Sequence, residues 1–213
     1  MTEKEKAARW ADDAERILTQ SGHDVSARYP FRLRSAHSRR VMKWAERLLE
    51  NHPEADREVL LCAAAFHDTG YSGEERLDHE TQSALIWDGY ARENSIDSVF
   101  ARKVRGCIAI HSEKHRMREP ETLTAEQLLL MEADLLDEEG AMGICWDGLS
   151  CGVLNTLTYR ASYERTAGHT EEKRYNPMVL DDARRLWDEK AAFVEKYVSE
   201  LEKDLEEYRL AGE

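Results

Sequence analysis

The chain has 213 residues, of which 41% are hydrophobic and 34% are charged, with only 11 Gly and 4 Pro. This apolar content is too high for a disordered chain, and the turn residues are too few for a protein of many strands. The formal charge of -13 at pH 7 disfavours duplex nucleic acid as a partner, because the protein's field repels polyanions. A small anion can still bind where a metal ion or a local cation reverses the sign.

The N-terminal residues MTEKEKAARWADD lack the apolar segment of a signal peptide, and no stretch reaches the ~18 to 20 apolar residues that span a bilayer. We therefore expect a cytoplasmic protein with no membrane partner. The cysteines form no CxxC pair and lie in or beside apolar runs, which is typical of reduced, buried side chains rather than of a zinc site. We assign no role to them; they are Cys62, Cys107, Cys145 and Cys151.

Helical periodicity dominates the chain. One apolar stripe joins Val41, Trp44 and Leu48, and a second joins Val104, Ile108 and His111, which would place His115 on the same helix. We find no convincing strand alternation, and we read the polar stretch from His115 to Thr124 as a loop. The sequence therefore predicts an all-α protein of seven or more helices, with one domain over residues 1–213.

Three helix starts carry capping signals. Asp78 can cap a helix that runs to about Arg92, and Thr124 with Gln127 forms a capping box before LLLMEADLL. Asn176 followed by Pro177 predicts the start of a C-terminal helix over roughly Met178 to Arg209. Its apolar seam, in which the residues are spaced four and three apart, is compatible with packing inside the domain or with a homodimer; the residues are Val194, Val198, Leu201, Leu205 and Tyr208.

Several polar residues fall where apolar residues are expected. His37 shares the stripe of Val41 and Trp44, a position at which a lone histidine is more often a hydrogen-bonded core residue than a metal ligand. The apolar run VLLCAAAF leads directly into His67 and Asp68, at what reads as the end of a helix. A buried carboxylate there faces the negative end of the helix dipole, and a bound cation would remove that penalty.

Asp134 repeats this anomaly within LLLMEADLL, where it must be paired, protonated or bound to metal. A pair with Arg40 or Arg105 is the structural alternative. Two imidazoles and two carboxylates form a mixed nitrogen and oxygen set that suits one divalent ion of Mn, Fe, Co, Ni, Mg or Zn, with positions left for water and substrate.

The ordered set His37, His67-Asp68 and Asp134 resembles the H…HD…D signature of the HD superfamily of metal-dependent phosphohydrolases. The surrounding segments resemble the small stand-alone bacterial members over residues 34 to about 146, leaving a helical extension over about 150–213; these segments are HSRRVMKWAERLL, AAAFHDTGY, DHETQSA, IAIHSEKH and EADLLDEEGAMGI. The resemblance implies a helical bundle with the metal between helices, held by those four residues.

By the same resemblance, His79 and His111 fall where some HD proteins bind a second ion, so one or two ions are expected, and either histidine could instead act in catalysis. Glu80 could share the role of His79. The doubled histidine of the HD-GYP subgroup is absent, because Ser112 follows His111. The spacing of His111 and His115 in HSEKH lacks the glutamate of zinc peptidases, so peptidase activity is disfavoured.

The resemblance implies hydrolysis of a phosphate ester or anhydride in a small molecule, with nucleotides as the favoured substrates. His79 or His111 would act as general base or acid, and Arg40 and Lys114 are the nearest cations for a substrate phosphate, although each can equally be a surface ion pair. The chain has no Gly-rich phosphate loop. Two alternatives are an HD-fold di-iron oxygenase and a non-catalytic module that binds a nucleotide or a partner.

Overall fold

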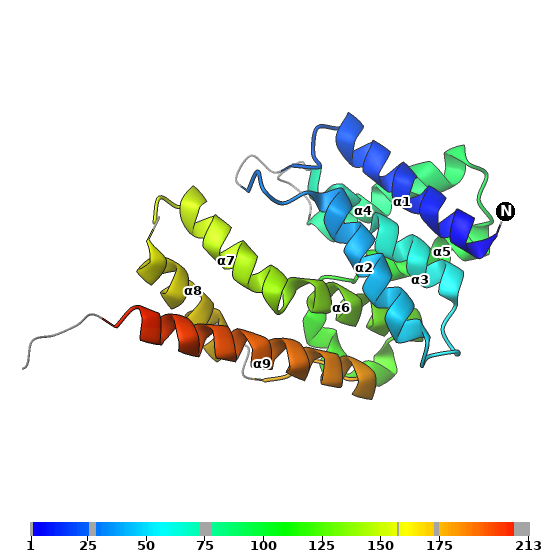
Figure 1. Ribbon diagram of the computed structural model, residues 1–213. Helices are drawn as coiled ribbons and strands as arrows, with labels where there is room; N and C mark the ends of the chain where they lie inside the picture. The colour runs from blue at the N-terminus through cyan, green and yellow to red at the C-terminus, as the bar shows by residue number, and fades with distance from the viewer. Residues whose placement is uncertain (1, 26–28, 73–77, 157, 173–174, 207–213) are drawn as a thin grey trace, which may run out of the picture. The chain divides into compact units, whose positions relative to one another are not determined.

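The computed structural model describes residues 2–25, 29–72, 78–156, 158–172 and 175–206 (Figure 1). Over these residues the regular structure is helical apart from one isolated bridge between Val25 and Leu33, which confirms the predicted all-α class. None of the described helices is long and apolar enough to cross a membrane. The α-helices are α1 Glu3–Gln20, α2 Arg34–Leu49, α3 Arg57–Phe66, α4 His79–Glu93, α5 Ser98–Ile108, α6 Ala125–Glu138, α7 Ala141–Val153, α8 Tyr159–Glu172 and α9 Asp181–Asp204.

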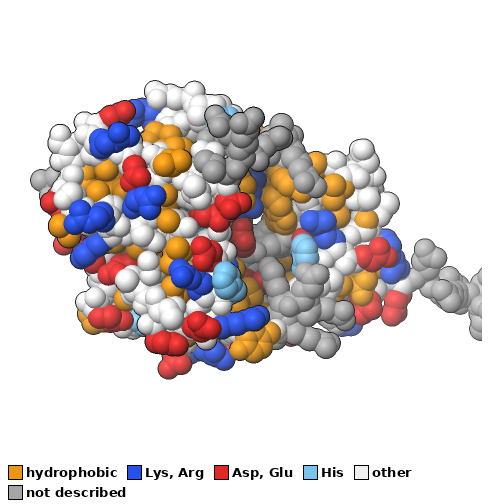
Figure 2. All heavy atoms as spheres, turned by 180° about the vertical axis from the view of Figure 1, so that it is seen from behind, with side chains coloured by type: hydrophobic (Ala, Val, Ile, Leu, Met, Phe, Trp, Pro, Cys, Tyr) orange, Lys and Arg blue, Asp and Glu red, His pale blue; other side chains and the backbone are white. Residues whose placement is uncertain are grey.

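Contacts divide the chain into two compact units, each described here by itself. Unit 1 comprises Met1–Asp137 and Met178–Ala183, and unit 2 comprises Glu138–Pro177 and Arg184–Glu213. The prediction of one domain over 1–213 stays a prediction. On the face shown in Figure 2, acidic and basic side chains are interspersed among the described residues, as in ordinary surface ion pairing.

Helix α3 is the centre of unit 1, where it contacts α1, α2 and α5 (Figure 1). Its residues from Val59 to Phe66 are all buried, and a helix that is apolar on every side belongs inside a core. The side chain of Asp56 caps the helix by accepting a hydrogen bond from the backbone N–H of Val59. The buried run therefore ends at a fixed place, directly before His67 and Asp68.

The predicted capping box at the start of α6 is confirmed. The backbone N–H of Gln127 donates to Thr124 Oγ1, and the backbone N–H of Thr124 donates to Gln127 Oε1. Asp78 precedes α4 as predicted, although its side chain makes no capping hydrogen bond. The predicted loop over 115–124 instead contains two short 3₁₀ helices, Lys114–Arg118 and Pro120–Thr122.

The predicted helix start at Asn176 and Pro177 is wrong, because α9 begins at Asp181. The backbone N–H groups of Val179 and Leu180 donate instead to the buried carboxylate of Glu132 on α6, which holds this segment of unit 1 outside the helix. Within α9, Val194 is buried as the seam predicts, and the helix ends at Asp204. The predicted seam residue Tyr208 and helix end Arg209 lie outside the described residues, and the homodimer stays a prediction.

The cysteines make no disulfide in the described structure. Cys62, Cys107 and Cys151 are buried as predicted, but Cys145 is exposed on α7, where the prediction of burial was wrong. In unit 2, Tyr163 on α8 donates a hydrogen bond to Glu202, and Arg165 pairs with the buried Asp147 at 3.4 Å. These contacts are typical of a helix flank.

Candidate metal centre

His67 and Asp68 reach the site from the end of α3. Gly70, two residues after Asp68, lets the start of α4 lie beside them. Gly70 approaches the start of α4 so closely that a Cβ atom there would lie 2.2 Å from the backbone nitrogen of Ser83 and 2.3 Å from the backbone oxygen of His79. Its own N–H donates to Ser83 Oγ. This contact brings the first turn of α4, and with it His79, next to Asp68.

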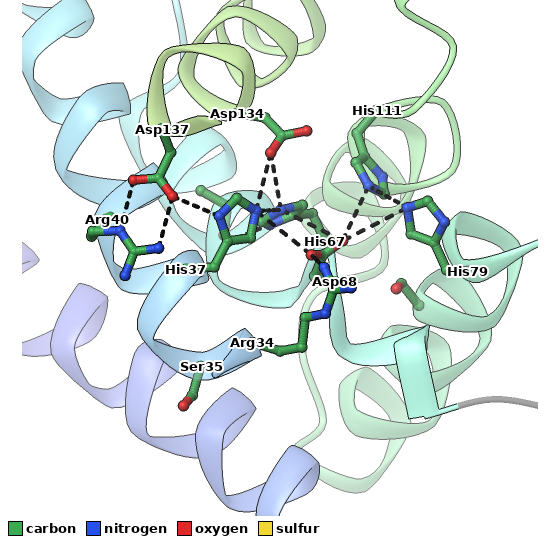
Figure 3. A network of polar contacts seen from close by, with 12 residues as sticks. Arg34, Ser35, His37, Arg40, His67, Asp68, His79, His111, Asp134 and Asp137 are labelled. Carbon is green, nitrogen blue, oxygen red and sulfur yellow. Dashed lines mark hydrogen bonds and ion pairs between the residues drawn. The ribbon is translucent and has the colours of Figure 1, made fainter. Parts of the chain in front are cut away.

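Four of the predicted residues converge between α2, α3 and α6 of unit 1 (Figure 3). His37 Nε2 lies 3.1 Å from Asp134 Oδ1, 3.4 Å from His67 Nε2 and 3.6 Å from Asp68 Oδ2. His67 Nε2 lies 3.7 Å from Asp68 Oδ1 and 3.8 Å from Asp134 Oδ1. Donor atoms bound to one ion at about 2.1 Å and at right angles are about 3.0 Å apart, so this spacing suits a single divalent cation.

His79 and His111 join the same cluster on its far side. Their Nε2 atoms are 3.1 Å apart, and each lies close to Asp68 Oδ1, at 3.7 Å for His79 and 3.6 Å for His111 (Figure 3). The carboxylate of Asp68 therefore stands between two donor sets. His67, Asp68 and His111 by themselves also form a group that could hold an ion.

The route by which His111 reaches the site differs from the prediction. Helix α5 ends at Ile108, so His111 and His115 do not share a helix with Val104. His111 Nδ1 donates to the backbone carbonyl of Ile108 at 2.7 Å, which satisfies a carbonyl left free by the end of the helix. The turn aims His111 at Asp68, whereas His115 lies in the 3₁₀ helix Lys114–Arg118.

The Nδ1 atoms of the cluster histidines face outward and leave Nε2 for the site. His67 Nδ1 bonds the carbonyl of Ala64 at 2.8 Å, and a carbonyl only accepts, so this nitrogen carries the proton. His37 Nδ1 lies 2.7 Å from Asp137 Oδ2, and His79 Nδ1 lies 3.2 Å from Glu80 Oε2. These partners orient the Nε2 atoms toward the centre.

Each of three buried or half-buried carboxylates has its own cation. Arg34 Nη1 lies 3.1 Å from Asp68 Oδ2, and Lys114 Nζ lies 2.7 Å from Asp134 Oδ2. Arg40 donates two hydrogen bonds to Asp137, at 2.8 and 3.0 Å. The pair expected for Asp134 was therefore assigned to the wrong cations, because Arg40 binds Asp137 and Arg105 binds Asp88 on α4.

Sequence reasoning did not identify Arg34, Tyr71 or Asp137. Arg34 is one helical turn before His37, and Asp137 is one turn after Asp134, so both share a face with a predicted ligand. The guanidinium of Arg34 stacks on the ring of Tyr71 at 3.3 Å, and Tyr71 stacks on His79 at 4.5 Å. Helical spacing could have revealed the first and last of these residues, but not the stacking of Tyr71.

Electrostatics gives Asp68, Asp134 and His67 the protonation states that metal ligands need. Burial alone would raise the pKa values of Asp68 and Asp134, but neighbouring histidines with Arg34 and Lys114 hold them well below the usual range. Burial lowers the pKa of His67 to about 4. Burial also opposes a charge on His37, yet its hydrogen bonds to Asp134 and Asp137 outweigh burial and raise its pKa to about 10. Without a metal ion, His37 is therefore protonated at pH 7, and it would have to release the proton on Nε2 to bind an ion.

The fold and the site together define a class of protein: an all-α bundle that holds a His, His-Asp and Asp cluster between its helices. Comparison with known families identifies this class. Residues 34–139 match the HD domain model, a range that contains the whole cluster, and the chain is an HD-domain protein. No curated protein matches the sequence.

Solved bacterial structures share this fold. One is a predicted HD superfamily hydrolase from an uncultured Thermotogales bacterium, with 20% identity over 92% of each chain and a TM-score of 0.62. An HD-superfamily hydrolase from Bacillus thuringiensis has 22% identity over 95% of this chain and 98% of that one, with a TM-score of 0.67. Bacillus subtilis YpgQ in complex with ADP has 24% identity over 96% of this chain and 97% of its own, also with a TM-score of 0.67.

Proposed function

We propose that this protein is a metal-dependent hydrolase that cleaves a phosphate ester or anhydride bond in a small molecule, with a nucleotide as substrate. The observation that carries the proposal is the convergence of His37, His67, Asp68 and Asp134 at ion-binding spacing, since this donor set suits a divalent ion with open positions. A divalent ion bound there supplies a water of lowered pKa and stabilises negative charge on a phosphoryl oxygen.

The surrounding residues support phosphoryl chemistry. His79 is partly exposed, and its Nε2 atom lies 3.1 Å from His111 Nε2, so this pair can take a proton from water or give one to the leaving oxygen. Burial is the leading cause that lowers the pKa of His79, which leaves the imidazole neutral at pH 7 as a general base requires. Glu80 holds the opposite nitrogen of His79 and orients the ring.

Recognition of an anionic substrate rests on the cations at the rim. Lys114 and Arg40 are both partly exposed and both pair with carboxylates of the cluster, so the predicted contact of either residue with substrate stays a prediction. A nucleotide is favoured as substrate because a protein of the same fold, YpgQ, has been solved in complex with ADP.

Turnover of a nucleotide panel tests the proposal. Purified protein is incubated with Mn²⁺ and nucleoside mono-, di- and triphosphates and cyclic nucleotides, and the products are separated by chromatography. Wild type should release a phosphate, a pyrophosphate or an opened cyclic phosphate, and Asp68→Ala should lose at least a hundredfold in rate. Asp88→Asn, which removes an exposed carboxylate on α4, is the matched control and should retain wild-type activity. Equal rates in wild type and Asp68→Ala would refute the proposal.

The second candidate is an HD-fold di-iron oxygenase, which is favoured by one observation. Asp68 Oδ1 faces His79 and His111 while Oδ2 faces His37, as a carboxylate that bridges two ions would. Two irons per chain and oxygen-dependent turnover would support this candidate over hydrolysis. A non-catalytic module that binds a nucleotide or a partner is disfavoured, since all four residues of the H…HD…D set are present and lie together (Figure 3).

A further inference from the structure

Among the histidines of the metal centre, His37 differs in having a buried carboxylate as its outer partner, whereas the carboxylate beside His79, that of Glu80, is partly exposed. The Nδ1 atoms of His67 and His111 bond backbone carbonyls, which are neutral acceptors. His37 Nδ1 instead lies 2.7 Å from the carboxylate of Asp137, whose side chain is only 3% exposed. A buried carboxylate is a costly choice for a purely structural hydrogen bond, because it must be desolvated.

Arg40 removes most of that cost. It donates from Nε to Asp137 Oδ1 at 2.8 Å and from Nη2 to Asp137 Oδ2 at 3.0 Å, a two-point contact of fixed geometry. Oδ2 therefore accepts from Arg40 and from His37 together (Figure 3). Both of these residues lie on α2, one turn apart, whereas Asp137 lies on α6.

We propose that Asp137 and Arg40 form an outer clamp that positions His37 as a metal ligand. The carboxylate accepts the proton on Nδ1, which selects the tautomer whose Nε2 lone pair faces Asp68, His67 and Asp134. Arg40 fixes the angle of the carboxylate and hence the plane of the imidazole ring. Both are positioning residues, and this role is separate from the predicted contact of Arg40 with a substrate phosphate.

The clamp also links two of the helices that supply ligands. Asp134 and Asp137 are one turn apart on α6, so His37 contacts α6 through Nε2 on one side of its ring and through Nδ1 on the other. A shift of α6 along its axis would break both contacts together. The clamp thereby sets the register of α2 against α6 at the centre.

The inference rests on the metal-binding part of the proposed function, and the dissociation constant for Mn²⁺ tests it without turnover. Calorimetric titration of metal-stripped protein should show binding weakened about 10- to 100-fold in Asp137→Asn, as for other outer partners of metal ligands. Arg40→Gln alters a partly exposed side chain and should weaken binding at least threefold. Asp88→Asn breaks an exposed Asp–Arg pair of the same unit and should bind as wild type does.

Three further readouts separate positioning from a general loss of structure. Without metal, Arg40→Gln and wild type should have the same helical circular dichroism, and excess Mn²⁺ should restore the turnover of both clamp variants. In protein loaded with Zn²⁺ and labelled with ¹⁵N-histidine, His37 should carry its proton on Nδ1 in wild type and should lose this preference in Asp137→Asn.

Wild-type affinity in Asp137→Asn would overturn the inference, and where that variant does not fold, wild-type affinity in Arg40→Gln would overturn it. If wild type binds Mn²⁺ but hydrolyses no nucleotide, the proposed function fails while the clamp is judged on affinity alone. If wild type binds no divalent ion, both are overturned.

Discussion

At the scale of single residues, a charged pair within unit 1 joins the first turn of α9 to the residues that follow α2. His52 Nε2 lies 3.1 Å from Asp182 Oδ1, and Asn51 donates to the other oxygen of this carboxylate. Burial works against the charge on His52, but the bonds to Asp182 and Glu54 outweigh it and raise the pKa. The pKa of Asp182 is lowered, because the bonds from His52 and Asn51 outweigh the effect of burial.

The sign of each pKa shift gives the pH window of this pair. The raised pKa of His52 gives stability that is complete below about pH 6.5, the unfolded value, and is lost as the pH rises through the folded pKa. The lowered pKa of Asp182 gives stability that is complete above about pH 4 and is lost as the pH falls through its folded pKa.

His52→Gln should therefore cost about 1 kcal/mol of unfolding free energy near pH 5.5 and much less at pH 9, measured by urea unfolding. His23→Gln, at an exposed position, is the control. Equal losses at both pH values would contradict this assignment.

At the scale of helices, the contact between Gly70 and α4 positions His79. Gly70→Ala places a methyl group against the backbone of Ser83 and His79, which cannot rotate away as a side chain does. We expect a loss of about 1–3 kcal/mol in unfolding free energy together with slower hydrolysis, as the start of α4 moves from Asp68. The matched control is Gly89→Ala on the same helix, where no atom lies within 4 Å and alanine favours the helix. Wild-type stability and activity in Gly70→Ala would show that the close contact is dispensable.

The helices and the centre differ in how far the sequence could predict them. His37, His67, Asp68 and Asp134 could be identified because each interrupts an apolar helix face, a signal that is local in sequence. The outer residues could not, since Asp137 bonds His37 across 100 positions and Tyr71 stacks on Arg34 through a tertiary contact. The start of α9 was mispredicted for the same reason. Asn176 and Pro177 are typical of a helix start, but the backbone N–H of Val179 donates to Glu132, which is distant in sequence.

At the scale of the molecule, a bound ion would add a further connection between helices that side-chain packing and hydrogen bonds already join. The ligands come from α2, the end of α3 and α6, so the donor set exists only in the folded chain. A ligand that binds only the folded state stabilises it by about 2.7 kcal/mol at one hundred times its dissociation constant. Chelation of the metal should thus lower the midpoint of thermal unfolding of wild type. Asp134→Asn should show a much smaller change on chelation, and an equal change would place the stabilising ion elsewhere.

The pairing of Asp68, Asp134 and Asp137 with Arg34, Lys114 and Arg40 has a consequence for how an anion arrives. The formal charge of -13 belongs to the remaining residues, because these three acids and three bases cancel. An approaching phosphate is therefore repelled by the outer surface and not by the centre. Dissolved salt screens exposed charges over a Debye length of about 10 Å at 0.1 M, and it screens these pairs less because their carboxylates are largely buried. For the anionic substrate of the proposed function, moderate ionic strength should therefore speed capture, the reverse of the behaviour of enzymes whose surfaces attract their substrates.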